Sequence, residues 1–150
     1  MGITKELATI DVDLGFFQTG NINAAINIDG LFGQVITLTG NATKRVLACV
    51  GTNGIATPDD ATAFINMAEE GYLSVLLDVL NKTITDKAAF AATDNFAPII
   101  LKDLETYNET NSAYIQSLIL GTPLTLLPNA TAISKNISMA FAKALLAYSD

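Results

Sequence analysis

Apolar residues recur every three or four positions along nearly the whole chain, which is the spacing of amphipathic helices. In the first segment they run from Ile3 to Phe17, and Gly20 ends the pattern. The spacing continues over residues 21–50, where three glycines weaken the helix without interrupting it. Residues 35–39 also suit a strand, but the persistent spacing favours one long helix.

Two further helices are predicted from their start signals. Thr57 can cap a helix, Pro58 suits the first helical position, and two aspartates follow, so we expect a helix over residues 57–90. Residues 93–95 are capping types and predict a fourth helix that runs to residue 120. Pro98 is tolerated in the first turn of that helix.

A fifth helix is predicted from Asn129 to Tyr148, after an apolar loop over residues 121–128. Short connections between helices are typical of an antiparallel bundle. We therefore predict an all-α fold, in which residues 1–150 form a single five-helix antiparallel bundle with a central hydrophobic cavity.

The composition suggests the cavity and argues against catalysis. Half of the residues are hydrophobic, only 15% are charged, and there is no histidine or tryptophan. Without histidine, a Ser-His-Asp site is impossible, and the ligands of a structural zinc are missing. We expect a binding protein that is not an enzyme and has no cofactor or metal.

Charge also excludes several partners. The net charge is −7, and Arg45 is the single arginine among scattered lysines, so no basic stripe exists for nucleic acid. The longest charge-free stretches contain glycine and prolines, which does not suit a membrane span. We interpret the acidic pairs as solvated faces: Asp11/Asp13, Asp59/Asp60, Glu69/Glu70 and Asp103/Glu105.

Polar residues on or beside the apolar stripes are the candidate site. Asn111 lies on the stripe of the fourth helix, Ser117 neighbours Tyr114, and Ser138 precedes Phe141. A buried serine can simply bond the carbonyl four residues back. Alternatively, Ser117 and Ser138 supply hydroxyls for the polar head of a ligand inside an apolar space.

Several motifs in this chain resemble the fungal hydrophobic-surface-binding protein family, which includes the ligand-binding domains of cell-wall galactomannoproteins. They are residues 7–14 (LATIDVDL), 76–82 (LLDVLNK), 87–90 (KAAF), 99–105 (IILKDLE) with Tyr107, 117–119 (SLI), Pro123, and 140–144 (AFAKA) with Tyr148. The resemblance implies a five-helix domain with a hydrophobic tunnel for long-chain fatty acids, including arachidonic acid. It places the polar binding groups near Ser117 and Ser138.

The apolar stripes supply the expected lining of that tunnel. Its predicted residues are Leu14, Phe17, Val35, Leu38, Phe64, Ala68, Tyr72, Val75, Leu104, Tyr107, Tyr114, Leu118, Phe141 and Leu145. Our hypothesis is therefore a carrier or scavenger of long-chain fatty acids or similar lipids.

Two alternatives remain open at this point. The domain adsorbs to hydrophobic surfaces and recruits hydrolases, or it buries its apolar excess by oligomerising; we expect a monomer or a weak homo-oligomer. The resemblance implies a secreted or cell-wall location. Five N-glycosylation sequons agree with this, at Asn41, Asn81, Asn108, Asn129 and Asn136.

Overall fold

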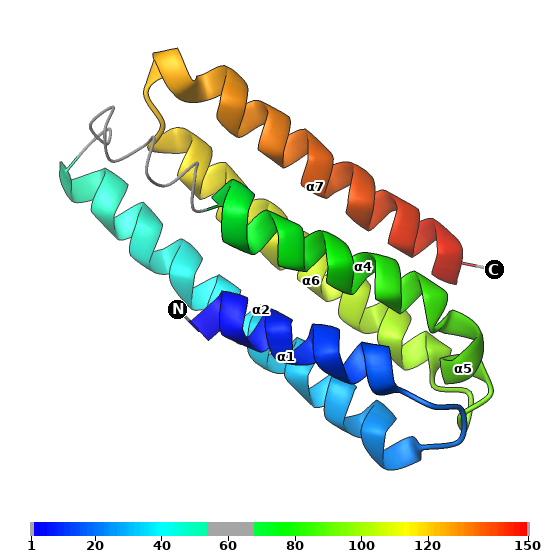
Figure 1. Cartoon of the computed structure of the whole chain (residues 1–150). Coiled ribbons are helices and arrows are strands. Elements are labelled where there is room, and N and C mark those ends of the chain that lie inside the picture. Colours follow the sequence, from blue (N-terminus) through cyan, green and yellow to red (C-terminus); the bar gives the residue numbers. More distant parts are fainter. Residues whose placement is uncertain (1, 54–67, 150) are drawn as a thin grey trace.

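The computed structural model describes residues 2–53 and 68–149, with the side chains of residues 2–48 and 71–149. In chain order the elements are α1 (Gly2–Phe16), α2 (Ile22–Asn53), the π-helix η1 (Ala68–Leu73), α4 (Ser74–Thr85), α5 (Lys87–Ala91), α6 (Ala97–Leu120), the 3-10 helix η2 (Leu124–Leu126) and α7 (Leu127–Tyr148). No strand occurs among the described residues, and the all-α prediction is confirmed (Figure 1).

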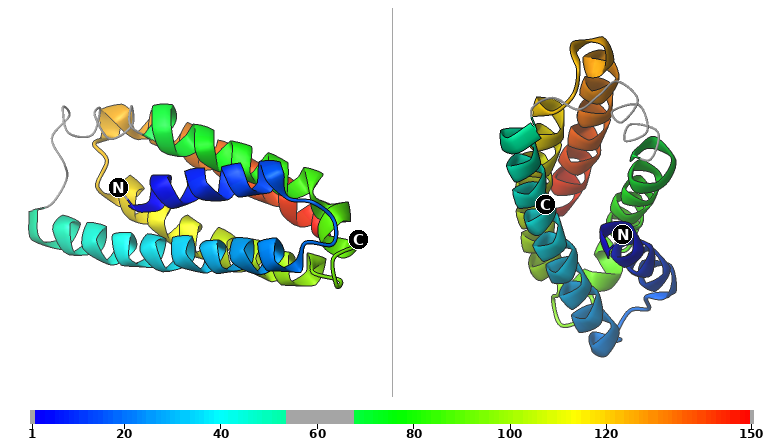
Figure 2. Two further views of the ribbon diagram at one scale, coloured as in Figure 1. Left: turned by 60° about the horizontal axis from the view of Figure 1, so that its bottom comes forward. Right: turned by 90° about the vertical axis from the view of Figure 1, so that its left-hand side faces the viewer.

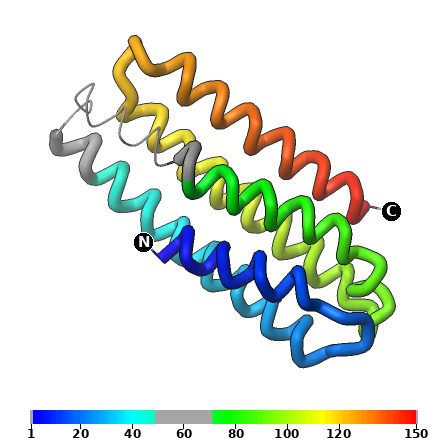
Figure 3. The backbone as a smooth tube through the Cα atoms, in the orientation of Figure 1, coloured from blue at the N-terminus to red at the C-terminus, as the bar shows by residue number. Residues whose placement is uncertain are grey.

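The five long helices of the described residues form a closed ring. Helix α1 packs against α2 and α4, α2 against α6, α6 against α7, and α7 against α4. Successive long helices run in opposite directions, as the colour gradient in Figure 3 shows. In a ring of five helices, the direction cannot alternate between all neighbours. Helices α2 and α6 are neighbours that run in the same direction. Helix α4 likewise runs parallel to both of its neighbours, α1 and α7.

The two N-terminal helices differ in length, and this makes the two ends of the bundle different. Helix α1 has 15 residues, whereas α2 has 32. Gly2, where α1 begins, lies next to Leu38, near the middle of α2. Helix α1 therefore accompanies only the first half of α2, as the left view of Figure 2 shows. The prediction of one continuous second helix is confirmed.

The predicted third helix is interrupted. Its expected start at Thr57 lies outside the described residues. At its other end, α4 stops at Thr85, Asp86 adopts φ −84° and ψ 0°, and the short helix α5 follows. The expected continuous helix to residue 90 is therefore wrong at Asp86, where a turn separates α4 from α5.

The expected cap of the fourth helix is also wrong. Asp94 and Asn95 adopt φ of 47° and 54°, a left-handed conformation that these two residue types tolerate. Helix α6 begins later, at Ala97, without a side-chain cap, although Pro98 does lie in its first turn as predicted. The hydroxyl of Thr93 instead accepts a hydrogen bond of 2.8 Å from the N–H of Gly20 and donates one to the Ala89 carbonyl.

That contact joins two turns at one end of the bundle. Gly20 has φ +91°, which glycine adopts without strain, and it lies between α1 and α2. Thr93 lies between α5 and α6. Phe17, beside Gly20, stacks on Phe90 with ring centroids 4.4 Å apart. A hydrogen bond and an aromatic stack therefore hold this end together.

The predicted fifth helix is present and begins slightly earlier than expected. Helix α7 starts at Leu127, and η2 occupies part of the predicted apolar loop. Among the described helices, none combines the length and apolar character that crossing a membrane requires.

Candidate functional site

Three polar side chains form a hydrogen-bonded chain inside the apolar bundle. Tyr72, on η1, donates its hydroxyl proton to Oδ1 of Asn111 on α6. The hydroxyl oxygens of Tyr72 and Tyr107 are 3.0 Å apart. Because Tyr72 has only one proton to donate, Tyr107 must be the donor in that pair. The order is therefore Tyr107 to Tyr72 to Asn111.

The tyrosines in and beside this cluster stay neutral at physiological pH. Burial is the main reason that the pKa values of Tyr72 and Tyr107 lie well above the ordinary value. Tyr114 packs edge-on against Tyr72 at 6.3 Å, and burial raises its pKa as well, opposed by Arg45. The interior thus contains protonated hydroxyls.

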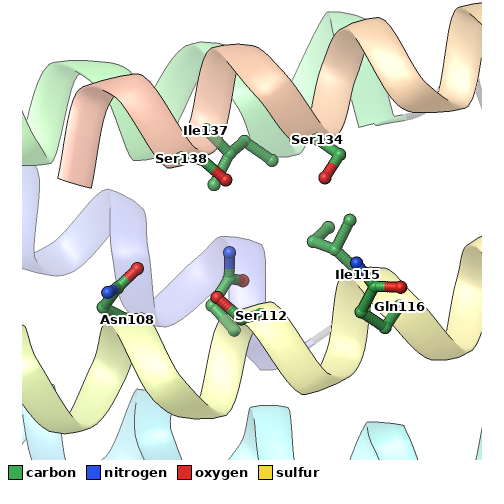
Figure 4. A pocket seen from close by; sticks show the side chains of 8 residues that line it. Asn108, Ser112, Ile115, Gln116, Ser134, Ile137 and Ser138 are labelled. Atoms are coloured by element: carbon green, nitrogen blue, oxygen red, sulfur yellow. The ribbon is translucent and has the colours of Figure 1, made fainter. Parts of the chain in front are cut away.

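Asn111 connects this interior cluster to a groove on the surface. Its side chain is 1% exposed, and its amide nitrogen donates no hydrogen bond within the described part of the chain. The residue lines a polar groove between α6 and α7 with a volume of about 40 Å³, enough for one or two water molecules. The groove is lined by Asn108, Asn111, Ser112, Ile115, Gln116, Ser134, Ile137 and Ser138 (Figure 4).

The structure separates the two serines that we selected from the sequence. Ser138 is exposed and lines the groove. Ser117 is buried, does not line the groove, and donates a 2.6 Å hydrogen bond to the Tyr114 carbonyl. A local backbone bond, one of the two alternatives drawn from the sequence, is thus present at Ser117, but it reaches the carbonyl three residues back and not the one four residues back.

The other groove residues were missed, although the sequence carries a signal for them. Asn108, Ser112 and Gln116 are spaced four residues apart on α6. Ser134 and Ser138 have the same spacing on α7. Residues four apart share one face of a helix, so two polar ridges line the sides of the groove, as Figure 4 shows.

The predicted apolar lining lies in two layers. Fully or almost fully buried are Leu14, Val35, Tyr72, Leu104, Tyr107 and Phe141. Half-buried against this core are Phe17, Leu38, Val75, Tyr114, Leu118 and Leu145. Phe64 and the side chain of Ala68 lie outside the described residues. The structure brings Tyr107 and Phe141 into edge-to-face contact at 5.3 Å.

Several core side chains in the half of the bundle that contains α1 are completely buried. Leu7, Ile10 and Phe32 are 0% exposed, so no water-sized space adjoins them. Toward the other end, Tyr72, Ile115 and Ile133 retain 7–9% exposure. Side chains therefore fill the core where α1 packs.

Two of the acidic residues that we expected on solvated faces are engaged. Asp103 on α6 is half-buried against Asp29 on α2, and burial together with this second carboxyl raises the pKa of Asp103 to about 8. Asp11 on α1 forms an ion pair with Lys82 on α4, whose nitrogen is 3.1 Å from Oδ1 but not aligned as a hydrogen bond. The solvated-face interpretation is wrong for Asp103 and Asp11.

Metal ligation finds no support in the described part of the chain. No group of three or more His, Cys, Asp or Glu side chains gathers there. The polar groups of the groove are neutral amides and hydroxyls, which suit hydrogen bonding to a ligand.

Solved structures of low sequence identity share this fold. Ligand-binding domain 1 of the Penicillium marneffei MP1 protein, complexed with arachidonic acids, has a TM-score of 0.88 at 15% identity, over 99% of this chain and 92% of that one. Domain 2 of the same protein, complexed with multiple arachidonic acids, has a TM-score of 0.87 at 14% identity, over 98% and 89%. Afmp4p in complex with palmitic acid has a TM-score of 0.81 at 18% identity, over 99% and 98%.

Other comparisons add nothing to this likeness. No family model matches the sequence, and no curated protein sequence matches it significantly. The bundle therefore has the fold of the MP1 and Afmp4p domains, as the resemblance of its sequence motifs implied.

Proposed function

We propose that this domain binds a long-chain fatty acid without transforming it, as a carrier or a scavenger. The likeness of nearly the whole chain to a domain solved with arachidonic acids is the observation that carries this proposal. The polar chain from Tyr107 to Asn111 supports it, because it links an apolar interior to a groove of neutral hydrogen-bonding groups.

The acyl chain belongs in the half of the bundle beyond the start of α1. There Tyr72, Ile115 and Ile133 retain 7–9% exposure. The half-buried side chains of Leu38, Tyr114 and Leu118 pack against the core. Each buried methylene contributes about 0.8 kcal/mol, so a long acyl chain gains on the order of 10 kcal/mol before association costs of about 4–15 kcal/mol. Part of this gain offsets the separation of side chains that fill the core.

The carboxylate belongs in the α6–α7 groove. An unpaired carboxylate is expensive to bury, and the groove provides a place where it meets both donors and water. The amide of Asn111 has protons to donate, and the hydroxyls of Ser134 and Ser138 line the same groove. Each hydrogen bond to a charged group contributes about 1.5–3 kcal/mol.

An extracellular location, secreted or in the cell wall, is part of the proposal. Four of the five sequon asparagines are exposed: Asn41, Asn81, Asn129 and Asn136. Asn108 instead lines the groove, where a glycan would obstruct the carboxylate site. We therefore propose glycans at Asn41, Asn81 and Asn129 and a free side chain at Asn108.

Native mass spectrometry tests the binding itself. Protein stripped of lipid and then incubated with oleic acid is expected to gain the mass of bound ligand. A protein that stays empty with both oleic and arachidonic acid contradicts the proposal.

A variant pair tests the position of the carboxylate. Ser134→Ala with Ser138→Ala removes two groove hydroxyls, and we expect at least about a tenfold loss of oleate affinity, corresponding to one charge-assisted hydrogen bond. Ser117→Ala is the matched control, because its hydroxyl is already bonded to the Tyr114 carbonyl, and its affinity should stay within twofold. The reverse ranking places the carboxylate near Ser117 instead.

A further inference from the structure

The outward face of α7 carries exposed apolar side chains in a continuous stripe. Met139 is 61% exposed and Leu146 is 71% exposed, and the exposed Ala142 lies between them. These residues and Lys135 follow one another at steps of four, three and four, so they lie on one side of the helix. The core-facing residues of α7, such as Ile137 and Phe141, lie on the opposite side.

The charge of this helix is opposite to that of the molecule. Helix α7 contains Lys135 and Lys143 and no aspartate or glutamate, whereas the whole chain has a net charge of −7. Both lysines are exposed beside the apolar stripe, and neither is ion-paired within the described part of the chain. A helix with apolar and basic residues on one solvent-facing side is typical of helices that lie on lipid surfaces.

Helix α1 shows that apolar exposure alone does not distinguish α7. Val12 and Phe16 on α1 are 54% and 81% exposed, four residues apart on one face. Their neighbours are Asp11 and Asp13, so the same apolar exposure occurs there among carboxylates. Unlike α1, helix α7 combines exposed apolar residues with lysines and contains no acidic residue.

We propose that the outward face of α7, defined by Lys135, Met139, Ala142, Lys143 and Leu146, docks on the surface of an anionic phospholipid bilayer. The helix lies along the bilayer, its lysines contact lipid phosphates, and Met139 and Leu146 enter the boundary of the acyl chains. Each lysine near an anionic surface strengthens binding by about fivefold. Salt at physiological concentration weakens the repulsion between the bilayer and acidic residues that lie more than about 8 Å from it, whereas the two lysines contact the lipid directly.

The docked orientation places the polar groove close to the lipid surface. Ser134 and Ser138 lie on α7 itself, between its outward face and α6. Docking rests on its own observations and does not require fatty-acid binding. The two proposals can therefore fail separately, because docking is measured on protein without bound fatty acid.

Vesicle flotation tests the docking face. The lipid-free chain is mixed with phosphatidylcholine vesicles that contain or lack phosphatidylglycerol, and we expect it to float with the anionic vesicles only. Lys135→Gln with Lys143→Gln should reduce partitioning about 25-fold, and Met139→Ser with Leu146→Ser about tenfold or more. The control, Val12→Ser with Phe16→Ser on α1, should float as the unchanged chain does.

All six substituted positions are exposed, so we expect each variant to retain the fold. Thermal unfolding of each variant checks this. Equal flotation of the α7 and α1 variants overturns the proposal, and so does an unchanged chain that floats with neither vesicle. Sedimentation tests the competing occupant: a dimer that the Met139 and Leu146 substitutions dissociate makes this face a contact between copies and also overturns lipid docking.

Discussion

The hydroxyl oxygens of Tyr72 and Tyr107 lie 3.0 Å apart in the interior of the bundle, although one residue is on η1 and the other on α6. Tyr72 donates a hydrogen bond to Asn111 and accepts one from Tyr107. It is therefore the central member of the cluster and the only one of the three that is bonded to both others. The cluster joins the segment that leads into α4 to the helix that forms one side of the groove.

This order predicts unequal effects of removing each hydroxyl. Tyr72→Phe leaves both Tyr107 and Asn111 without their buried partner, at about 1–3 kcal/mol for each unsatisfied group. Tyr107→Phe removes only the terminal donor and should cost about 1 kcal/mol. Urea unfolding of the two variants measures the difference, and equal losses would show that the proton order is different.

Stability is expected to fall as the pH rises from about 4 to about 8. Burial raises the pKa of Asp103 to about 8 in the folded chain, whereas an unfolded aspartate titrates near 3.9. Between these values the folded chain binds the extra proton, so raising the pH favours unfolding. Burial also raises the pKa of Asp86, to about 6, which adds the same trend at the acidic end of this range.

Asp103→Asn tests this assignment, because the amide has nearly the same shape as the carboxyl group and does not ionise. The urea midpoint of the variant should exceed that of the unchanged chain at pH 8 and vary less between pH 5 and pH 8. Asp78→Asn on the exposed side of α4 is the control and should preserve the original pH dependence. An Asp103→Asn variant with an unaltered pH profile would contradict the raised pKa.

The contact between Gly20 and Thr93 should contribute measurably to stability. Thr93→Val keeps the shape but deprives the Gly20 N–H of its acceptor, and we expect a loss of about 1–2 kcal/mol. Thr85→Val is a matched control, because the exposed Thr85 hydroxyl bonds only the carbonyl of Asn81 four residues earlier. Thermal or urea unfolding compares the two, and losses of the same size would argue against a role for the link between the turns.

Fatty-acid binding should raise the unfolding temperature. A ligand that binds only the folded chain adds about 2.7 kcal/mol when its free concentration is 100 times its dissociation constant. For a domain of this size that is roughly 5–11 °C. Differential scanning calorimetry with increasing oleic acid checks the expectation, and methyl oleate, which lacks the carboxylate, should give a smaller shift if the groove holds the head group.

The long helices could be predicted because the spacing of apolar residues within each segment is enough to indicate a helix, without knowledge of its neighbours. The three glycines within α2 did not mislead the prediction, since apolar residues on both sides keep the helical spacing. The turn at Asp86 and the left-handed residues Asp94 and Asn95 could not be predicted this way. Thr93 is a good capping type, but a residue 73 positions away, Gly20, provides its partner.

The candidate site was only partly predictable for a related reason. The stripe of α6 placed Asn111 inside, but its pairing with Tyr72 depends on how η1 meets α6. Ser138 was expected inside because it precedes the core residue Phe141 by three positions. Three residues fall short of a full turn of 3.6 residues, so Ser138 is rotated away from Phe141 and lies at the exposed edge of the helix. Four-residue spacing shows which polar residues share one face of a helix. It indicates a groove only when it is also known which two helices are neighbours.

The difference in length between α1 and α2 has a consequence for the size of the guest. Residues 39–53 of α2 extend past the start of α1, a stretch of about 22 Å at the helical rise. A hydrogen bond between Gly20 and Thr93 holds the opposite end together. If the proposed fatty acid separates the helices, we expect the separation to occur in this stretch, whose length would then limit the length of the bound acyl chain. Short fatty acids would leave part of that length unfilled. Affinity should therefore increase with the length of the acyl chain until the chain is as long as this stretch of α2.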